Sequence, residues 1–324
     1  MSQASWRTGS EVKGSRERVM DVSIVTSLYA SRRHLAGFLE RLEACIRSVE
    51  ACGCSAESII VSNAPDRSER RTLRAAFDSP WWHDHGKLIV VPRETLYASW
   101  NRGLRVSLGS AIAFWNVDDY RNPAAIVEGI ELIRRRHVVV RFPWLYIEEL
   151  EPARSGSKRR IVFYDRGEQS RLDPQVDFCL GPFFMFHRGL FEQFGPFDEQ
   201  FHIAGDYDWQ LRVVPHTGLH WGNELAGVFV KDGTNLCGTG SPRALLERNV
   251  VFERHGLDRP SWLLDDRAQE LFATYRIPTS TDSGVTRNWS YDRRWRRRQA
   301  ASRIYHRCRQ LAATPIRLMR SWIG

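Results

Sequence analysis

The sequence predicts an α/β protein with a doubly wound, mostly parallel sheet, a small antiparallel addition and helices toward the C-terminal end. Three observations indicate this class. Short β-branched runs alternate with helical patterns over residues 22–142, as in βαβ units. After Phe142 the alternation gives way to two short strand patterns around a Pro/Ser/Gly/Lys stretch. Finally, a chain of 324 residues with 42% hydrophobic and 26% charged side chains can bury a sizeable core.

The first half of the chain contains the elements of the parallel sheet. Val22–Leu28 is a short β-branched run that predicts a buried strand, and the apolar residues from Leu35 to Val49 recur at the three- and four-residue spacing of a helix. By the same patterns we expect strands at Ser58–Ser62, Lys87–Val91, Ala111–Asn116 and His137–Phe142, and helices at Ser68–Phe77, Leu96–Leu108 and Pro123–Arg135.

The second half of the chain has shorter and less regular elements. Trp144–Glu149 and Arg160–Tyr164 flank a turn-forming stretch, and we expect them to pair as antiparallel strands. The Gly-rich segment Lys231–Pro242 is expected to be a loop. The remaining elements are expected as strands at Phe183–Phe186 and Leu225–Val230 and as helices at Asp206–Val214 and Ala244–His255.

The positive charge of the chain is concentrated near its C-terminal end. The net charge is +9, yet residues 287–322 hold eleven arginines and a single acidic residue. The part before Arg287 is therefore close to neutral, which argues against a nucleic-acid-binding core because such a core carries its own positive excess. The apolar residues of the tail recur at helical spacing, which is typical of an amphipathic helix on an anionic membrane surface. A solvated helix packed on the protein or on a partner is the alternative.

Cysteine usage and hydropathy indicate the location of the protein. The six cysteines are scattered and lack zinc-site spacing, as expected for reduced thiols in a cytosolic protein. The first residues carry no apolar signal-peptide core, and no stretch approaches the roughly 20 apolar residues of a spanning helix. We therefore expect a cytoplasmic protein, which would lie on the inner face of the membrane if the tail binds lipid.

Two adjacent carboxylates follow the fourth predicted strand. Asp118 and Asp119 stand just past the apolar run that ends at Trp115, and ligands of an open parallel sheet bind beyond the carboxyl ends of its strands. Holding two such charges together is costly without a cation nearby. A divalent metal that also binds phosphate oxygens would meet this need. The alternative is that the pair only begins a turn and caps the next helix.

A second acidic cluster lies ninety residues later. Asp206 occupies the position of a helix N-cap, with Trp209 and Val213 on one face of the helix that follows. A carboxylate in this place can act as a general base that removes a proton from a substrate hydroxyl. A plain helix cap is again the alternative.

Taken together, these residues resemble the inverting glycosyltransferases of family 2, which have the GT-A fold. The resemblance covers about residues 22–257 and rests on motifs that occur in the family's order. They are the strand Val22–Ser27, a polar residue after the second strand, Asn101-Arg102-Gly103-Leu104, Asp118-Asp119, Gly195-Pro196-Phe197-Asp198 and Gly205-Asp206-Tyr207-Asp208.

The resemblance implies roles for individual residues. Thr26 matches a position that contacts the nucleotide base, and Asn101 matches an asparagine in the helix before the metal-binding strand. Asp118 and Asp119 match the DXD-type motif, with Asp118 toward the ribose and Asp119 on a Mn²⁺ or Mg²⁺ ion that bridges the diphosphate. Asp206 matches the catalytic base.

The chain departs from the family pattern in two places. Where the family has an aspartate that recognises the base, this chain has Ser62 and Asn63, which can still hydrogen-bond a uracil or thymine edge. The Gln-x-x-Arg-Trp motif of processive synthases is missing, since Gln210 is followed by Leu211-Arg212-Val213. We therefore expect a non-processive enzyme.

These implications define a domain layout and a function. We expect a flexible N-terminus over 1–20, a catalytic domain over 21–277, a linker over 278–288 and the basic tail over 289–324. Within the domain, 21–142 would bind the nucleotide and 143–257 the acceptor. The expected reaction moves a sugar from a nucleotide-sugar donor to a glycan or lipid-linked acceptor. The alternatives are a sugar-phosphate nucleotidyltransferase and a non-catalytic membrane-binding adaptor.

Overall fold

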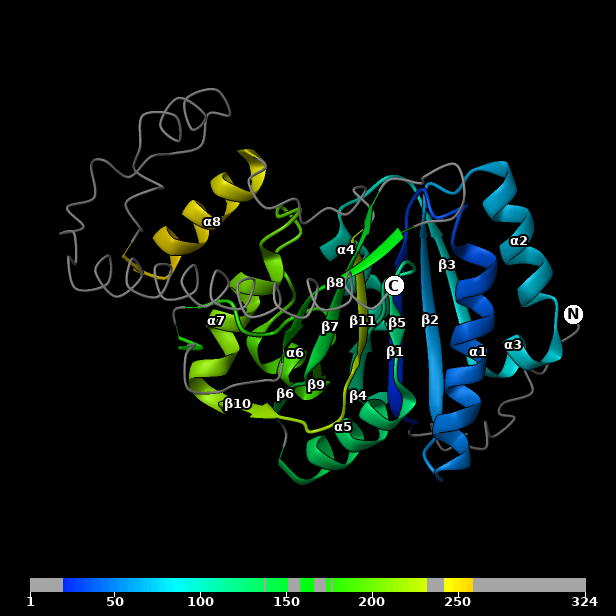
Figure 1. The fold of residues 1–324 in the computed structure, drawn as a ribbon, viewed down its shortest axis with the longest axis horizontal. Helices are drawn as coiled ribbons and strands as arrows, with labels where there is room; N and C mark the ends of the chain where they lie inside the picture. Colours follow the sequence, from blue (N-terminus) through cyan, green and yellow to red (C-terminus); the bar gives the residue numbers. More distant parts are fainter. Residues whose placement is uncertain are drawn as a thin grey trace, which may run out of the picture.

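The computed structural model describes residues 20–136, 138–150, 158–165, 173–175, 177–231 and 242–258. Within these residues the strands form a seven-stranded and a four-stranded sheet (Figure 1). The larger sheet contains β1 (Met20–Leu28), β2 (Ala56–Asn63), β3 (Gly86–Val91), β4 (Gly109–Phe114), β6 (Val139–Arg141), β9 (Met185–His187) and β10 (Leu219–Trp221). The smaller sheet contains β5 (Tyr120–Arg121), β7 (Trp144–Leu150), β8 (Lys158–Asp165) and β11 (Gly227–Lys231).

Eight helices surround the sheets in the described part of the chain. They are α1 (Leu35–Ala51), α2 (Arg67–Phe77), α3 (Pro80–His85), α4 (Leu96–Arg105), α5 (Pro123–Arg136), α6 (Gly189–Phe194), α7 (Gly205–Thr217) and α8 (Pro242–Arg254). None of them is both long and apolar enough to cross a bilayer.

The larger sheet is mostly parallel, as the sequence predicts. Its order is β10-β6-β9-β4-β1-β2-β3. β1 pairs in parallel with β2 and β4, β2 with β3, and β10 with β6, whereas β9 runs antiparallel to both β4 and β6. The chain moves outward from β1 in opposite directions to β2 and to β4, so the topological switch point lies between β1 and β4. The edge at which β1 to β4 end is called the carboxyl edge below, and it is where ligands of such sheets bind.

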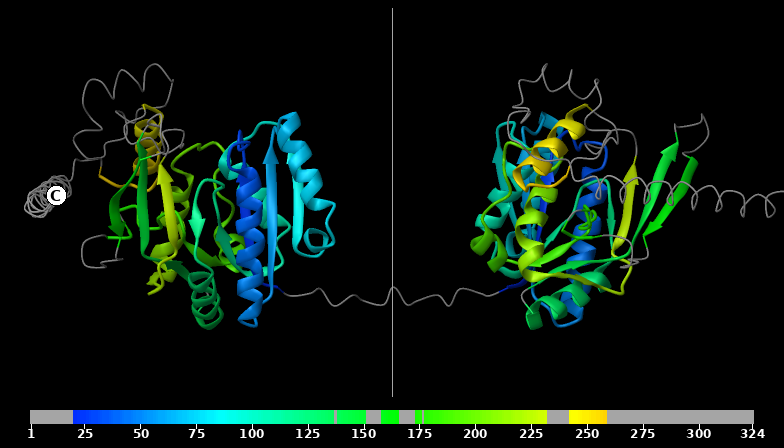
Figure 2. Two further views of the ribbon diagram at one scale, coloured as in Figure 1. Left: turned by 45° about the vertical axis from the view of Figure 1, so that its right-hand side comes forward. Right: turned by 90° about the vertical axis from the view of Figure 1, so that its left-hand side faces the viewer.

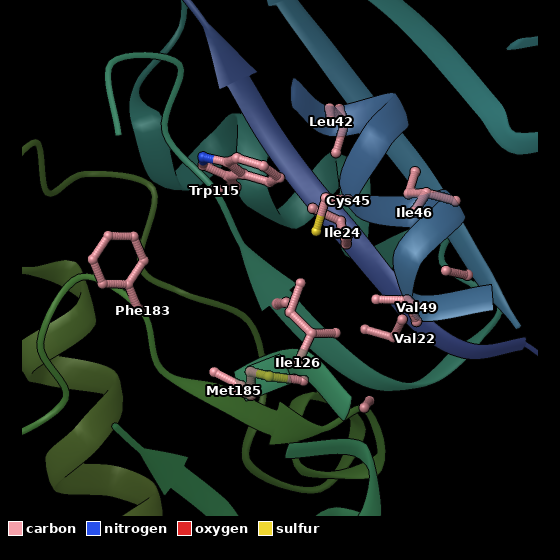
Figure 3. Packing of buried hydrophobic residues seen from close by; sticks show 14 of the residues in the cluster. Val22, Ile24, Leu42, Cys45, Ile46, Val49, Trp115, Ile126, Phe183 and Met185 are labelled. Atoms are coloured by element: carbon pink, nitrogen blue, oxygen red, sulfur yellow. The ribbon is translucent and has the colours of Figure 1, made fainter. Parts of the chain in front are cut away.

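Two apolar cores lie on the two faces of the larger sheet. Strand β1 supplies both, since Val22, Ile24 and Leu28 point to one core and Val25 points to the other, as the two-residue period of a strand requires. The first core includes the buried faces of α1 and α5 (Figure 3). The second includes those of α4, α6, α7 and α8. Helices on both faces make the sheet doubly wound.

The smaller sheet packs on the α1 and α5 side of the larger one (Figure 2). The expected antiparallel pair is confirmed, because β7 and β8 pair from Trp144↔Asp165 to Leu150↔Lys158. However, the sheet is not wholly antiparallel, since β7 also pairs in parallel with β11. β5 completes it by pairing antiparallel to β11.

Most differences from the predicted elements concern short segments. α3, α6, β5 and β10 were not expected, because elements of two to six residues show no full period of apolar positions. α3 does carry a local signal, since Ser79 caps its first turn and Pro80 begins it. α4 ends at Arg105, three residues earlier than predicted. Most of the predicted N-terminus, and the whole of the linker and the basic tail, lie outside the described residues.

The close packing of β4 against β1 provides a test of the fold. A Cβ atom at Gly109 would collide with the backbone of Val22 and Ser23, which cannot move aside as a side chain can. We expect Gly109→Ala to lower the free energy of unfolding by about 1–3 kcal/mol. Gly37→Ala is the matched control, because its Cβ would meet only the flexible end of Arg41, at 3.3 Å, and alanine is favoured in a helix by up to about 1 kcal/mol.

Urea denaturation followed by circular dichroism measures both changes. Equal midpoints for Gly109→Ala and the wild-type protein would contradict the described β1–β4 packing.

Candidate active site

The predicted acidic residues lie at the carboxyl edge of the larger sheet. Asp118 and Asp119 follow β4 directly. β10 runs parallel to β6, and β9 is antiparallel to both β6 and β4, so β10 begins at the opposite edge of the sheet. α7 ends at Thr217, just before β10. Its first turn, with Asp206, therefore lies at the same edge as Asp118.

Asp206 has a carboxylate suited to proton transfer. Burial raises its pKa to about 6, although hydrogen bonds from Tyr97 and from the backbone N–H of Tyr207 and the nearby Arg248 cation act in the opposite direction. The hydrogen-bond distances to its Oδ1 are 3.0 Å from the Tyr97 hydroxyl and 2.9 Å from the Tyr207 nitrogen. A carboxylate that titrates near neutral pH can accept a proton in one step and release it in the next.

Tyr97 is a site residue that sequence reasoning missed. Its hydroxyl oxygen lies 2.7 Å from the carbonyl oxygen of Ile203 and 3.0 Å from Asp206 Oδ1. Its ring is buried, and a Cβ at Gly205 would lie 2.7 Å from two of its ring atoms. Glycine before Asp206 therefore leaves room for Tyr97. The sequence could not reveal this contact, because 109 residues separate the tyrosine from the aspartate.

Asp119 is held inside the protein. It has no exposed surface, its Oδ1 accepts a hydrogen bond from the Val230 nitrogen at 3.1 Å, and its Oδ2 accepts one from Asn116 Nδ2 at 3.1 Å. Burial raises its pKa well above the usual value, and the adjacent Asp118 raises it further. Asp119 therefore holds a contact with β11, and its expected contact with a metal stays a prediction. Asp118 is the member of the pair with exposed surface.

Asn63 and Asn101 also bind backbone groups of the protein, and their expected nucleotide contacts stay predictions. Asn101 Nδ2 donates to the carbonyl oxygen of Phe197 at 2.8 Å and to Glu199 Oε1 at 2.9 Å, and its Oδ1 accepts from the Phe197 nitrogen at 3.0 Å. Asn63 bonds both the nitrogen and the carbonyl oxygen of Glu94. Both asparagines are buried. Each amide thus holds a loop at the carboxyl edge and faces away from solvent.

Thr26 and Ser62 are buried within the sheet. Thr26 has no exposed surface and lies on the strand face that Ile24 and Leu28 share. Ser62 is 1% exposed and pairs with Leu28. These two residues are buried, and their expected contacts with a nucleotide base stay predictions.

The exposed groups at the ends of β1 and β3 are Tyr29 and Arg93. Tyr29 is 52% exposed, and the Arg93 guanidinium lies 3.1 Å from the centre of its ring. The sequence contained a signal for both, since Tyr29 follows directly after one predicted strand and Arg93 lies two residues after the end of another. Because β1 and β4 are parallel neighbours at the switch point, Tyr29 and Asp118 follow strands that end at the same edge of the sheet.

Comparison with known proteins identifies the family and the type of fold. The family model described as "Glycosyl transferase family 2" matches residues 23–195, more than half of the chain. The S. aureus TarS 1–349 structure has a TM-score of 0.51 at 14% identity, covering 85% of this chain and 78% of TarS 1–349. Its complex with UDP-GlcNAc has a TM-score of 0.53 at 12% identity, covering 86% and 79%. The Pyrobaculum calidifontis mannosyltransferase PcManGT, solved with GDP-Man and Mn²⁺, has a TM-score of 0.50 at 14% sequence identity. The match covers 73% of this chain and 63% of PcManGT. No curated protein sequence matches the chain.

The hydrogen bond from Tyr97 gives a first prediction for the site. The hydroxyl stabilises the ionised form of Asp206, so Tyr97→Phe should raise the pKa of Asp206 above its value of about 6. The carboxylate would then become ionised only at a higher pH than in the wild-type protein. The measurement is the ¹³C shift of the Asp206 carboxyl carbon as a function of pH. Tyr120→Phe serves as the control, and a midpoint that Tyr97→Phe leaves unchanged would contradict the contact.

The contacts of Asn101 give a second prediction. Asn101→Ala leaves the nitrogen and the carbonyl oxygen of Phe197 buried without their partner, so we expect the free energy of unfolding to fall by about 2–4 kcal/mol. Nucleotide affinity of the folded protein should stay within about twofold, because the hydrogen bonds of this amide go to the protein itself. Urea denaturation and titration with UDP and GDP measure the two quantities, with Gln175→Ala as an exposed control. If Asn101→Ala loses nucleotide affinity but keeps its stability, the result would support the nucleotide-binding role that the resemblance implies for Asn101.

Proposed function

Since the chain belongs to glycosyl transferase family 2, we propose that it is a non-processive inverting enzyme that moves a sugar from a nucleotide diphosphate to a hydroxyl acceptor. The doubly wound sheet with its added smaller sheet is the GT-A fold of its structural neighbours. The observation that carries the proposal is the place of Asp206. A carboxylate with a pKa of about 6 begins α7 at the same edge of the sheet as Asp118.

Asp206 would act as the general base of the transfer. Its ionised carboxylate takes the proton of the acceptor hydroxyl while the acceptor oxygen attacks the anomeric carbon of the donor. The bond from that carbon to the diphosphate breaks on the opposite side, and the nucleoside diphosphate leaves with the electron pair. In-line displacement of this kind inverts the anomeric centre. Proton transfer to a positioned carboxylate contributes about 10²–10⁴-fold in rate.

We propose that a divalent cation assists the departure of the diphosphate leaving group. PcManGT was solved with Mn²⁺ and GDP-Man, and Mg²⁺ or Mn²⁺ needs only one or two carboxylates when phosphate oxygens complete its coordination. No group of three or more His, Cys, Asp or Glu suited to a metal exists among the described residues, which suits a cation shared with the substrate. When bound, the metal would neutralise charge on the leaving diphosphate.

Asp118 is the residue that we assign to this cation. It has exposed surface at the end of β4, whereas Asp119 is buried and bonded to β11. Asp119 would then fix the loop on which Asp118 stands. This assignment replaces the sequence-based one, in which Asp118 contacts the ribose and Asp119 the metal.

The donor and acceptor are proposed only by class. Neighbouring structures hold UDP, UDP-GlcNAc and GDP-Man, so we propose a nucleotide-sugar donor whose base lies near the exposed ring of Tyr29. A glycan or lipid-linked acceptor, a cytoplasmic location and contact of the basic tail with the inner face of the membrane complete the proposal. That tail lies outside the described residues.

The loop after β1 argues against a sugar-phosphate nucleotidyltransferase. That function needs a Gly-rich loop whose N–H groups cradle phosphates. Here the Ser31 nitrogen donates to Glu69 Oε1 at 2.5 Å, so a carboxylate already occupies the donor and would repel phosphate. The non-catalytic adaptor leaves the raised pKa of Asp206 without a purpose.

Two variants separate the proposed roles of the carboxylates. Asp118→Asn should remove Mn²⁺-dependent donor binding, because the amide cannot replace a charged ligand. Asp206→Asn should keep donor affinity within about twofold and lower transfer by about 10²–10⁴-fold, because it removes only the base. Calorimetric titration with UDP-GlcNAc and GDP-mannose measures binding, and release of the nucleoside diphosphate measures turnover.

Glu43→Gln on the exposed face of α1 is the control for these variants. Asp206→Asn turnover at the wild-type rate would rule out the general base. If metal-dependent donor binding is kept by Asp118→Asn and lost by Asp119→Asn, then Asp119 and not Asp118 would be the metal ligand.

A further inference from the structure

Glu247 of α8 binds three consecutive backbone N–H groups just before α7. Its Oε2 accepts from the nitrogens of His202, Ile203 and Ala204 at 3.1, 2.6 and 2.9 Å, and its Oε1 accepts from the His202 nitrogen at 3.0 Å. Glu247 is 7% exposed. Consecutive N–H groups in a turn form an anion-binding concavity, and here a side chain from the protein itself fills it. Arg243 Nε donates to Glu247 Oε1 from the exposed side, at 3.0 Å.

The peptide group between Ile203 and Ala204 connects Glu247 to the candidate base. The N–H of this group belongs to Ala204 and donates to Glu247. Its carbonyl belongs to Ile203 and accepts from the Tyr97 hydroxyl at 2.7 Å. The same hydroxyl lies 3.0 Å from Asp206 Oδ1. A single planar amide thus joins the Glu247 carboxylate to Tyr97, whose one hydroxyl proton is shared between the Ile203 carbonyl oxygen and Asp206 Oδ1.

α7 depends on this external contact because it has no cap of its own. Its N-cap residue, Ala204, cannot accept a hydrogen bond through its side chain. The hydrogen bond from the Tyr207 nitrogen goes to Asp206 itself, so the candidate base is also part of the helix start. Anything that shifts the turn over residues 202–204 therefore shifts Asp206.

A second contact holds α8 on the same helix. Asp208 has no exposed surface and accepts from Arg254 Nη1 at 3.0 Å, with His255 Nε2 at 3.1 Å from the same oxygen. Arg212 of α7 bonds its other oxygen at 3.1 Å. α8 is therefore fixed to the first turn of α7 from two points, and Glu247 has a defined position from which to act.

We propose that Glu247 is a positioning residue for Asp206, acting through the Ile203–Ala204 peptide and the Tyr97 hydroxyl. The inference rests on the proposed function of Asp206 and adds a residue well beyond the segment 23–195 that the family model matches. It predicts that the base loses its alignment when the Glu247 charge is removed, while the donor site around Asp118 is unaffected.

The main test is Glu247→Gln in the full chain, measured by turnover of UDP-GlcNAc and of GDP-mannose with water as the acceptor. We expect kcat to fall on the order of 10²-fold, since small misplacement of a catalytic group has effects of this size, and KM for the donor to stay within about twofold. In the Asp206→Asn background the same change should have no further effect on kcat. An equal fold-loss in both backgrounds would overturn the proposal, as would an unchanged kcat.

Arg243→Gln is the matched control. It removes the exposed partner of Glu247 and leaves the three backbone hydrogen bonds in place, so kcat should remain at the wild-type level. Should Glu247→Gln not fold, Glu247→Asp replaces it, because it keeps the charge but shortens the reach by one methylene.

A second measurement is independent of turnover. Thermal midpoints of Glu247→Gln, Tyr97→Phe and the double variant report whether the two residues act through one peptide. We expect the shift of the double variant to be smaller than the sum of the single shifts, because coupled residues are not additive. Additive shifts would overturn the proposal. If the wild-type protein consumes neither donor but the shifts are non-additive, the link from Glu247 to Tyr97 stands and the proposed function, with those donors, fails.

Discussion

The structure depends on the requirement that buried backbone polar groups have hydrogen-bond partners. At the carboxyl edge these partners are buried side chains that reach the backbone of a distant segment, which is strand β11 for Asp119 and a loop for the others. Each binds an N–H or carbonyl group that would otherwise lack this partner. They are Asn63 at Glu94, Asn101 at Phe197, Asp119 at Val230, Gln210 at Cys179 and Glu247 at Ile203.

These contacts explain why polar residues at the edge differ so much in exposure. Asp118 and Asp206 keep exposed surface, whereas the buried Asp119 and Asn101 bind backbone groups. The buried set makes the loops rigid, and rigid loops are what allow a carboxylate to be held in one orientation. Residue type alone does not separate the two sets, since aspartates occur in both.

Two requirements meet in the first turn of α7: buried backbone groups need hydrogen-bond partners, and the Asp206 carboxylate must be held in one orientation. Burial gives Asp206 a pKa of about 6, and partners from α4 and α8 hold the Ile203–Ala204 peptide just before it. Stability and reactivity therefore depend on the same few hydrogen bonds.

The sequence alone determined the order of the elements, the doubly wound sheet and the family resemblance, because apolar periodicity and short motifs are local properties of the chain. It also placed Asp118 just past a strand, and it placed Asp206 in the first turn of a helix, although the N-cap is Ala204 and not Asp206 as expected. Only the tertiary structure decided which polar residues face solvent and which bind a loop. Those contacts join residues 31–111 positions apart, from Asn63 with Glu94 to Asp119 with Val230. Local patterns carry no information on which distant backbone group will need a partner.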